Sequence, residues 1–254
     1  MSTKALKTQL LAAIAMVLVA GIALGSSTYA WFASNNQVTA QGMTVNATAD
    51  ASLVIKGTQD NSFGSVGTNK LEAKTLKPST SYDGKNFGKL AAGVKVESSG
   101  DEKATWTGTS GAFQSADLEL VDAADTYYAT TEYTIKSLVE NANVYVKSIT
   151  LGGTGDNIDD ALRISVTIGS TTYVYNAGGG TNSGEGVGKY DATTWTLVAA
   201  SYTTADDNTK TFSLVADTEA KATINIWYEG QDTNCFSENV TTNDKTITIE
   251  FAKA

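Results

Sequence analysis

Hydrophobic and polar residues alternate, with a period of two, along most of the chain after residue 42. In the segment "LRISVTIG" at 162–169, every second residue is leucine, isoleucine or valine. Runs of the same kind are "MTVNATA", "EYTIKSLV", "NVYVKSITL", "TTYVYNA", "ATINIWYEG" and "KTITIEF". Such alternation, in β-branched runs separated by Gly, Asn and Asp, predicts half-buried β-strands. Nine or ten such runs predict an all-β fold, and we expect an antiparallel, jelly-roll-like β-sandwich.

Residues 56–118 interrupt the alternation, because they are polar, rich in glycine and weak in strand signals. We therefore expect one β-sandwich domain over 43–254 that carries a long polar insertion at 56–118. The single proline, Pro78, falls inside this insertion. Almost every other backbone N–H in the chain can therefore pair, which suits long ladders of strands.

The N-terminus has the organisation of a secretory signal peptide. Two lysines precede the uncharged stretch Leu10 to Gly25, and the small residues of "SSTYA" follow. As a helix, this stretch spans about 24 Å, less than the roughly 30 Å of a bilayer's hydrocarbon core. We predict an apolar signal helix within 1–30 and cleavage between Ala30 and Trp31. The alternative is an anchor that the assembled protein retains.

The charge of the chain argues against nucleic acid as a partner. The whole chain has 18 basic and 27 acidic residues and a net charge of -9. Loss of Lys4 and Lys7 with the signal peptide leaves 16 basic residues against 27 acidic ones, a net charge of -11. Nucleic-acid binding needs a basic face, whereas this chain has one arginine, Arg163, and scattered lysines. We predict a secreted, extracellular protein of the cell surface that meets a membrane only through its precursor signal segment.

Histidine is absent from the sequence, which excludes several kinds of active site. A Ser–His–Asp triad, a Cys–His dyad and a zinc site of the HExxH type all require this residue. Paired carboxylates can still perform glycoside hydrolysis. The acidic candidates in or beside predicted strands are Glu132, Glu140, Glu229 and Glu250. The sequence gives no distance between them, and we expect no catalytic residue, no cofactor and no enzymatic activity.

Three clustered acidic residues are weak candidates for a calcium site: Asp156, Asp159 and Asp160. Calcium binds carboxylate oxygens, but the spacing of these residues matches no EF-hand. Acidic clusters in loops are usually only solvated. We therefore predict no metal, with calcium as the alternative.

Three tryptophans and one cysteine have ordinary structural interpretations. Trp106, Trp195 and Trp227 can stack on sugar rings, but aromatic residues on strands are more often core or cross-strand partners. Cys235 is the single cysteine, so no disulfide within the chain can form. It is either a buried small hydrophobic residue or an exposed thiol that links two chains.

The segment "GSSTYAWFASNNQVTAQGMTVNATA" at 25–49 resembles the start of the TasA/camelysin group of secreted Gram-positive proteins. Precursors in that group carry a signal that ends in a Gly/Thr/aromatic/Ala segment and is read by a SipW-type signal peptidase. An aromatic dipeptide and an N-terminal strand follow directly. Three other stretches are similar to clostridial surface proteins with the same start: "LKPSTSYDGKNFGKL", "ALRISVTIGSTTYVYNAGG" and "INIWYEGQDTNC".

The resemblance implies a jelly-roll subunit of an extracellular or biofilm-matrix fibre. In TasA-like fibres, the N-terminal strand of one subunit completes the sheet of the next. Camelysin-type members have been described as metallopeptidases. This chain departs from them because it has no histidine, so that activity is not carried over.

General physical reasoning favours the same mode of assembly. A sandwich that lacks one strand presents an unpaired edge, which a strand from another chain can complete. Because such a contact joins two different surfaces, it propagates as an open filament. Residues 31–42 are the predicted donor or first strand, and the predicted subunit-interaction residues are Trp31, Phe32, Val38 and Gly42. The alternative is that this segment pairs within its own subunit.

We therefore expect a structural subunit of a homopolymeric extracellular fibre, assembled head to tail by donation of the N-terminal strand. Polysaccharide or other matrix components are the further partners that we consider. The alternative function is a monomeric secreted adhesin or carbohydrate-binding module. Concentration-dependent assembly distinguishes the two, because a lone binding module stays monomeric.

Overall fold

The computed structural model shows a protein built from β-strands. The residues that it describes are 38–50, 52–71, 74–81, 83–90, 96–99, 103–106, 118–121, 127–138, 140–152, 160–177, 188–190, 197–199, 202–230, 235 and 244–254. They belong to one compact unit, Gln37–Ala254, and contain no α-helix. Among these residues, accordingly, no helix is long and apolar enough to cross a membrane. The predicted signal helix, its cleavage site and the aromatic pair Trp31 and Phe32 lie outside them.

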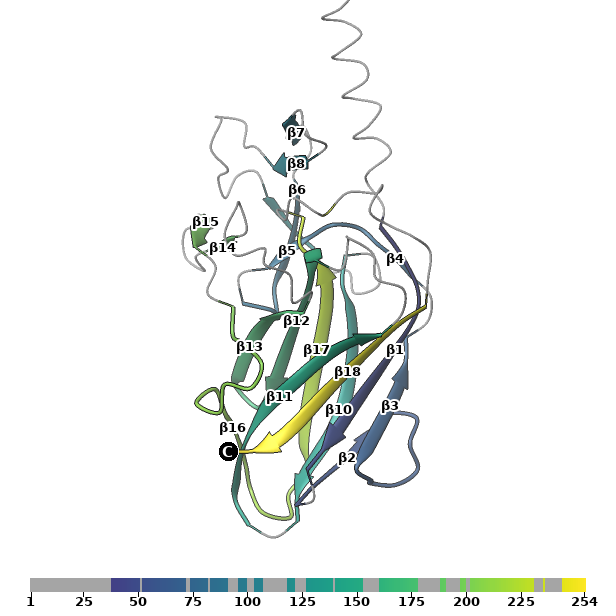
Figure 1. The fold of residues 1–254 in the computed structure, drawn as a ribbon, viewed down its shortest axis with the longest axis vertical. Helices are drawn as coiled ribbons and strands as arrows, with labels where there is room; N and C mark the ends of the chain where they lie inside the picture. The colour runs from purple at the N-terminus through teal and green to yellow at the C-terminus, as the bar shows by residue number, and fades with distance from the viewer. Residues whose placement is uncertain are drawn as a thin grey trace, which may run out of the picture. The chain divides into compact units, whose positions relative to one another are not determined.

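Two β-sheets enclose a common hydrophobic core (Figure 1). The first sheet has the order β16 (Phe212–Leu214), β11 (Ala142–Gly152), β18 (Asp244–Lys253), β1 (Val38–Ala49) and β3 (Val66–Lys70), with β4 (Lys74–Leu76) also paired to β1. The second has the order β13 (Thr171–Asn176), β12 (Leu162–Ile168), β17 (Ala220–Tyr228), β10 (Ala129–Ser137) and β2 (Leu53–Gly57). The all-β, sandwich-like character predicted from the alternation is confirmed.

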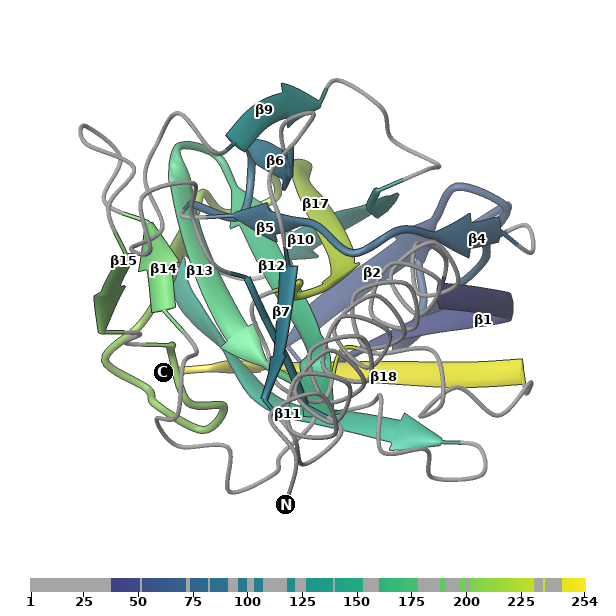
Figure 2. The same cartoon turned by 90° about the horizontal axis from the view of Figure 1, so that it is seen from above.

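Three small sheets accompany the two large ones. They are β5 (Thr80–Ser81) with β6 (Phe87–Leu90) and β9 (Leu118–Val121), β7 (Val96–Ser99) with β8 (Lys103–Trp106), and β14 (Gly188–Tyr190) with β15 (Leu197–Ala199). Figure 2 shows β5, β6 and β9 gathered near the end of β17. The β5–β6–β9 sheet is therefore placed to cover part of the second sheet.

Side-chain burial follows the alternation of the sequence. Along β10, buried and less buried residues alternate without interruption, and Tyr133 and Ile135 point into the core. On β18, Ile247, Ile249 and Phe251 are fully buried. Burial of each such side chain contributes roughly 1.5–3 kcal/mol to folding. The inward-facing residues of both sheets therefore supply the main driving force for the sandwich.

β12 departs from this alternation, because six of its seven residues are buried. Its apolar residues face the core, and Arg163 and Ser165 face the opposite, outer side, where they are also fully buried. An aromatic cluster covers this outer side: the Phe87 ring stacks on Tyr128 at 4.0 Å and meets Trp227 edge-on at 5.2 Å. The second sheet is therefore buried on both faces around β12 and β17.

Part of the predicted polar insertion, 56–118, belongs to the sandwich itself. β3 and β4 line β1 in one continuous antiparallel register, with Lys70 opposite Thr44 and Lys74 opposite Ala40. β5 and β6 add the cover over the second sheet. The alternation did not predict β3, because its segment "VGTNK" has one large apolar residue, Val66, and that residue is 51% exposed. Pairing with β1, more than its own hydrophobicity, holds this strand in the sheet.

β1 and β18 pair in parallel, with Val45 opposite Ile247 and Ala47 opposite Ile249. Every other described ladder is antiparallel. The expectation of a wholly antiparallel sandwich is therefore wrong at this one ladder. The parallel pairing is possible because β1 and β18 are not consecutive strands, and only a direct hairpin connection forces two neighbouring strands to run antiparallel.

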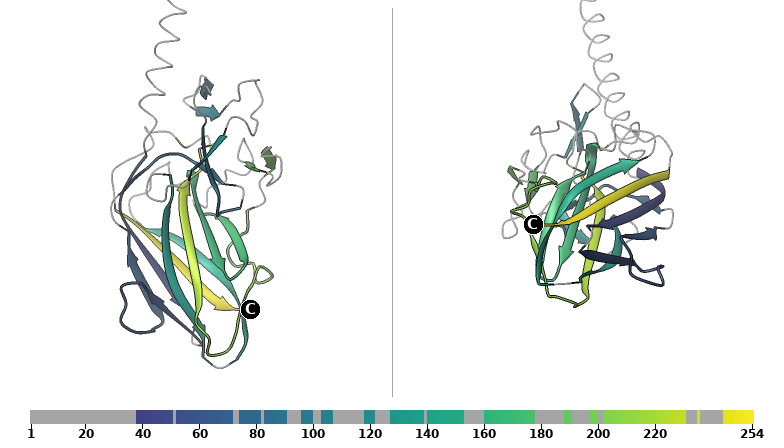
Figure 3. Two further views of the ribbon diagram at one scale, coloured as in Figure 1. Left: turned by 180° about the vertical axis from the view of Figure 1, so that it is seen from behind. Right: turned by 60° about the horizontal axis from the view of Figure 1, so that its bottom comes forward.

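Connections differ in length between the two ends of the strands (Figure 3). At the end where β1 stops, the connections are short: 50–52, 138–141, 169–170 and 215–219. The connections that leave from the end where β1 begins are long: 77–128, 153–161, 177–211 and 229–243. Long connections on a rigid scaffold are common places for function. The elaborated end of the sandwich is thus also the end from which the N-terminal strand starts.

Candidate functional site

The candidate assembly strand, β1, is an interior strand of the first sheet. It lies between β18 on one side and β3 with β4 on the other, and its Val45 and Ala47 are fully buried. Val38, a predicted subunit-interaction residue, lies opposite Leu76 of β4. Gly42, another, lies within the register shift of the β1–β18 ladder. In a single chain, β1 thus pairs with its own subunit from Val38 onward.

The edge of the sandwich formed by β2 and β3 is closed by hydrogen bonds between the two sheets. Ile55 and Gly64 exchange backbone hydrogen bonds of 2.8 and 3.0 Å. Behind them, the buried Asn69 of β3 donates to the Thr131 hydroxyl of β10 at 2.8 Å and accepts the Thr58 N–H at 2.8 Å. These bonds occupy main-chain groups that a foreign strand would need at this edge.

The opposite edge is closed in part by residues 202–211. The Thr203 N–H donates to the Val174 carbonyl of β13 at 2.8 Å, and the Asp206 N–H donates to the Val146 carbonyl of β11 at 3.0 Å. This segment therefore joins the edge strand of the second sheet to β11 of the first. β16 pairs with β11 only over Ala142–Val144.

One stretch of β11, residues 147–152, has no ladder partner on its outer side among the described residues. Its inner side pairs with β18. Ile149 and Leu151 on this stretch are half-buried against the core. A cavity of about 300 Å³ lies beside Ile149, and its other walls come from the end of β13, with Tyr175 and Ala177, and from residues 202–205. An open strand edge with a neighbouring cavity is the arrangement that accepts an added strand.

The carboxylates considered for glycoside hydrolysis have separate partners. Hydrogen bonds from Lys253 and Lys147 hold the pKa values of the Glu140 and Glu250 carboxyls, respectively, below their usual range. A glycosidase acid needs the opposite shift, a raised pKa. The geometry therefore does not prepare either group to donate a proton.

Glu229 is fully buried, and its Oε2 accepts a hydrogen bond from the Trp227 indole N–H at 3.2 Å. Glu132 lies opposite Thr223 on β17. From Thr223 to Glu229 the strand direction covers about 20 Å at 3.3 Å per residue. Glycosidase carboxylates lie roughly 5–9.5 Å apart, so these two acids do not form such a pair.

The tryptophans considered for sugar stacking are not brought together among the described side chains. Trp227 is fully buried under Phe87, so its ring is not available to a sugar. Trp106 is on β8, whose side chains are outside the described set, and Trp195 lies outside the described residues altogether. The interpretation of Trp227 as a core residue is the one that its burial supports.

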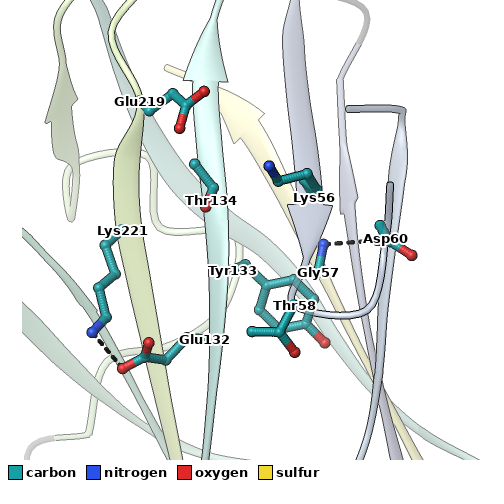
Figure 4. Close-up of a pocket in the computed structure, with 9 residues that line it drawn as sticks. All are labelled: Lys56, Gly57, Thr58, Asp60, Glu132, Tyr133, Thr134, Glu219 and Lys221. Atoms are coloured by element: carbon teal, nitrogen blue, oxygen red, sulfur yellow. Dashed lines mark hydrogen bonds and ion pairs between the residues drawn. The ribbon is translucent and has the colours of Figure 1, made fainter. Parts of the chain in front are cut away.

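A shallow groove of about 370 Å³ crosses the outer face of β2, β10 and β17 (Figure 4). Within it, Lys221 forms an ion pair with Glu132 at 2.5 Å, and the Gly57 N–H donates to Asp60 Oδ2 at 2.7 Å. Lys56 adds a second ammonium group to the lining. Exposed pairs of this kind contribute about 0–1 kcal/mol. The groove is thus a charged surface in which the carboxylates of Glu132 and Asp60 already have partners.

No group of three or more Cys, Asp or Glu side chains that could hold a metal ion occurs among the described residues. Of the three acidic residues considered for calcium, Asp160 is described, and its main-chain carbonyl accepts a hydrogen bond from Arg163 at 2.6 Å. Asp156 and Asp159 lie outside the described part of the chain. Cys235 is buried, which is the first of its two predicted alternatives.

Sequence reasoning missed the residues that lock the outer face of the second sheet. Arg163 and Ser165 occupy polar positions of an alternating strand, a pattern that predicts exposure to solvent. The signal that could have found them is the aromatic content of nearby segments, because large rings such as Phe87 and Trp227 pack on a sheet face and bury it.

Comparison of the chain with protein-family models, with curated proteins and with solved structures finds no match in any of the three.

Proposed function

We propose that the chain is a structural subunit of an extracellular fibre, assembled by donation of its N-terminal strand to a neighbouring copy. Its precursor is secreted through a signal helix that is cleaved between Ala30 and Trp31, and its sandwich is of the jelly-roll type found in the TasA-like proteins that its N-terminus resembles. The observation that carries this proposal is that β11 has no ladder partner on its outer side at 147–152 among the residues that the structure describes.

The proposed donor is the segment 31–37, which precedes the part of β1 that pairs within its own subunit. Val38 already lies opposite Leu76 of β4, so donation of β1 itself would break existing ladders. Seven extended residues span about 23 Å at 3.3 Å each. A donor of this length reaches a neighbour without disturbing the sandwich that carries it.

The proposed acceptor is the outer side of β11 at 147–152, six residues that span about 20 Å. The lengths of donor and acceptor therefore correspond. A donated strand hydrogen-bonds to the open main chain, and its alternate side chains enter pockets. The cavity of about 300 Å³ beside Ile149 is the proposed pocket for one aromatic side chain of Trp31 or Phe32.

Because donor and acceptor are different surfaces, the contact repeats from copy to copy and gives an open filament. The β2–β3 edge, closed by Asn69 and by the Ile55–Gly64 pair, does not compete for the donor. Protected edges of this kind direct association to one site. A single type of contact then builds the fibre.

The first experiment compares a chain that starts at Trp31 with one that starts at Gly42, by light scattering and negative-stain microscopy. We expect fibres from the first and small soluble species from the second, because only the first carries the donor. Monomers from both would overturn fibre formation and favour the monomeric binding module instead.

The second experiment tests the acceptor in the chain that starts at Trp31. Ile149→Lys places a charge on the inner face of the open edge, a device that blocks strand addition. Val215→Lys, at a side chain 61% exposed in the 215–219 connection, adds the same charge elsewhere and serves as the control. We expect the first variant to remain folded and fail to polymerise, and the control to form fibres. Normal fibres from Ile149→Lys would show that the acceptor lies at another edge.

A further inference from the structure

A second groove, of about 560 Å³, runs along the outer face of the edge strand β13. Thr172 and Val174 contribute to its floor, the turn 83–86 provides one wall and residues 202–210 provide the other. The volume falls in the range of about 300–1,000 Å³ that is common for small-ligand sites. The lining differs from that of the groove in Figure 4. Tyr202, Thr203 and Thr204 also line the cavity beside Ile149, so the groove adjoins the surface proposed for strand donation.

The first wall is held firmly on the sheet beneath it. Gly84, in the left-handed region with φ of 72°, presents its carbonyl oxygen to the Ser165 hydroxyl at 2.6 Å and to the Asn225 amide at 2.9 Å. Both donors are buried. Asp83 closes the turn by accepting the Asn86 N–H at 2.7 Å. This wall is therefore fixed before any ligand arrives.

The second wall is fixed by the single arginine of the chain. The guanidinium carbon of Arg163, which is fully buried, lies 4.9 Å from the centre of the Tyr202 ring. Its Nη1 donates to Asn176 Oδ1 at 3.0 Å, so the cation that supports the ring is itself held in place. The next residue, Thr203, donates its N–H to the Val174 carbonyl at 2.8 Å. A cation under an aromatic face orients the ring, and burial strengthens that attraction.

The groove between these walls is polar and carries balanced charge. Lys85 and Asp83 lie on one wall, and Lys210 and Asp207 lie on the other. The remaining polar lining consists of residues with hydroxyl groups: Ser170, Thr172, Tyr173, Tyr202, Thr203 and Thr204. A hydroxyl group both donates and accepts hydrogen bonds. This lining therefore matches a neutral ligand that is itself rich in hydroxyl groups and has a face that can lie on an aromatic ring.

Two other ligand classes fit this groove less well. A peptide strand would need an open β13 edge, but Thr203 already occupies the main chain there at Val174 and forms a bridge with Tyr175. An anionic polymer would need an excess of positive charge. Here two aspartates offset the two lysines, in a chain of net charge -9.

We propose that this groove along β13 binds a neutral oligosaccharide, with Tyr202 as its aromatic platform and the hydroxyl and charged side chains of the two walls as hydrogen-bonding partners. Such a site would attach the protein to polysaccharide, whether the protein is polymeric or not. The inference goes beyond the proposed fibre and does not depend on it. The groove could be found only in the folded protein, because its parts come from three separate segments of the chain.

The test is isothermal titration of the full chain with cellohexaose, maltohexaose, mannohexaose and xylohexaose, and with hexagalacturonate as an acidic counterpart. We expect binding of at least one neutral hexasaccharide and weaker or no binding of the acidic one. Thr204→Arg, at an exposed side chain on the second wall, should fill the groove without touching the core and reduce affinity by at least about tenfold. Tyr202→Ala should do the same by removal of the platform.

The matched control is Thr218→Arg, which adds the same side chain at an exposed position that lines neither groove. Thermal melting of each variant confirms that it is folded, which matters most for Tyr202→Ala because that ring covers Arg163. No binding of any of the four neutral sugars would overturn the proposal. Binding that Thr204→Arg leaves unchanged, or a preference for hexagalacturonate, would overturn it as well.

Discussion

The Tyr133 hydroxyl of β10 donates a hydrogen bond to the Val45 carbonyl of β1 at 2.5 Å, and this contact joins the two sheets through the middle of the core. Both residues are buried, Val45 completely. Loss of contact with water on burial raises the pKa of the Tyr133 phenol above its ordinary value of 10.0. β1, the strand that follows the proposed donor segment in the sequence, is therefore fixed to the opposite sheet by a neutral tyrosine.

Tyr133→Phe removes this hydrogen bond and keeps the ring. We expect the free energy of unfolding to fall by about 1–2 kcal/mol, the usual cost of losing one partner of a buried hydrogen bond. Urea unfolding at pH 7 measures it as a lower midpoint with an unchanged slope. Tyr145→Phe, at a half-buried ring on β11, is the control and should change stability by less than about 0.5 kcal/mol. Equal effects of the two substitutions would contradict a specific role for the Tyr133–Val45 contact.

The raised pKa of Tyr133 predicts a loss of stability in alkaline solution. The folded state favours the neutral phenol, so its contribution is fully present below the unfolded pKa of about 10 and is lost as the pH rises further. Burial shifts the pKa of Tyr175 in the same direction. We expect the urea midpoint to fall above pH 10 and to fall less steeply in Tyr133→Phe than in the unchanged chain. Identical slopes in the two proteins would rule out a contribution from this phenol.

Gly84 and Gly169 form a matched pair for backbone strain. Both have positive φ, of 72° and 62°, but a methyl group at Gly84 would lie 2.4 Å from Ser165 Cβ, whereas one at Gly169 would meet nothing within 4 Å. We expect Gly169→Ala to cost about 1–2 kcal/mol from φ alone. Gly84→Ala should cost about 1–3 kcal/mol more because of the overlap. Thermal or urea unfolding of the two variants decides the matter, and a smaller cost at Gly84 would mean that the turn can lift from the sheet.

The interior position of β1 predicts where the chain tolerates truncation. A chain that starts at Gly42 keeps the buried Val45 and Ala47 and should fold. One that starts at Ser52 loses β1 and its three ladders, with β18, β3 and β4, and should not fold, because most domains are stable by only roughly 5–15 kcal/mol. Circular dichroism and limited proteolysis should show a folded first chain and an unfolded second. A folded protein without β1 would mean that the sheet can close again between β18 and β3.

The sequence was most informative where one strand face meets the core and the other meets solvent. The alternation in "KTITIEF" and "EYTIKSLV" is strong enough to predict β18 and β10, because a period of two matches the pleat of a strand and differs from the 3.6-residue period of a helix. It was least informative for β3, whose segment "VGTNK" contributes main-chain pairing and little apolar surface. Strands that are held by their neighbours leave a weak mark on the sequence.

The candidate sites were less predictable than the strands. The aromatic pair at Trp31 and Phe32 could be proposed from the local sequence, and it lies outside the described residues. The side of β11 that has no ladder partner among the described residues and the groove along β13 could not be proposed, because each depends on which segments meet in space. Residues 83–86 and 202–210 are far apart in the chain and become two walls of one groove.

By itself, the sequence determined the class of the fold, through the alternation of its apolar residues, and excluded histidine-dependent chemistry through its composition. The tertiary structure alone decided that β1 and β18 lie side by side in parallel and that Arg163 and Glu229 are buried. It also decided that, within the described part of the chain, residues 147–152 of β11 have a ladder partner on one side only. The physical reason is range. Periodicity reports how one strand meets water and core, whereas pairing order, the cover over a second face and the closure of an edge depend on contacts between segments that the chain keeps far apart.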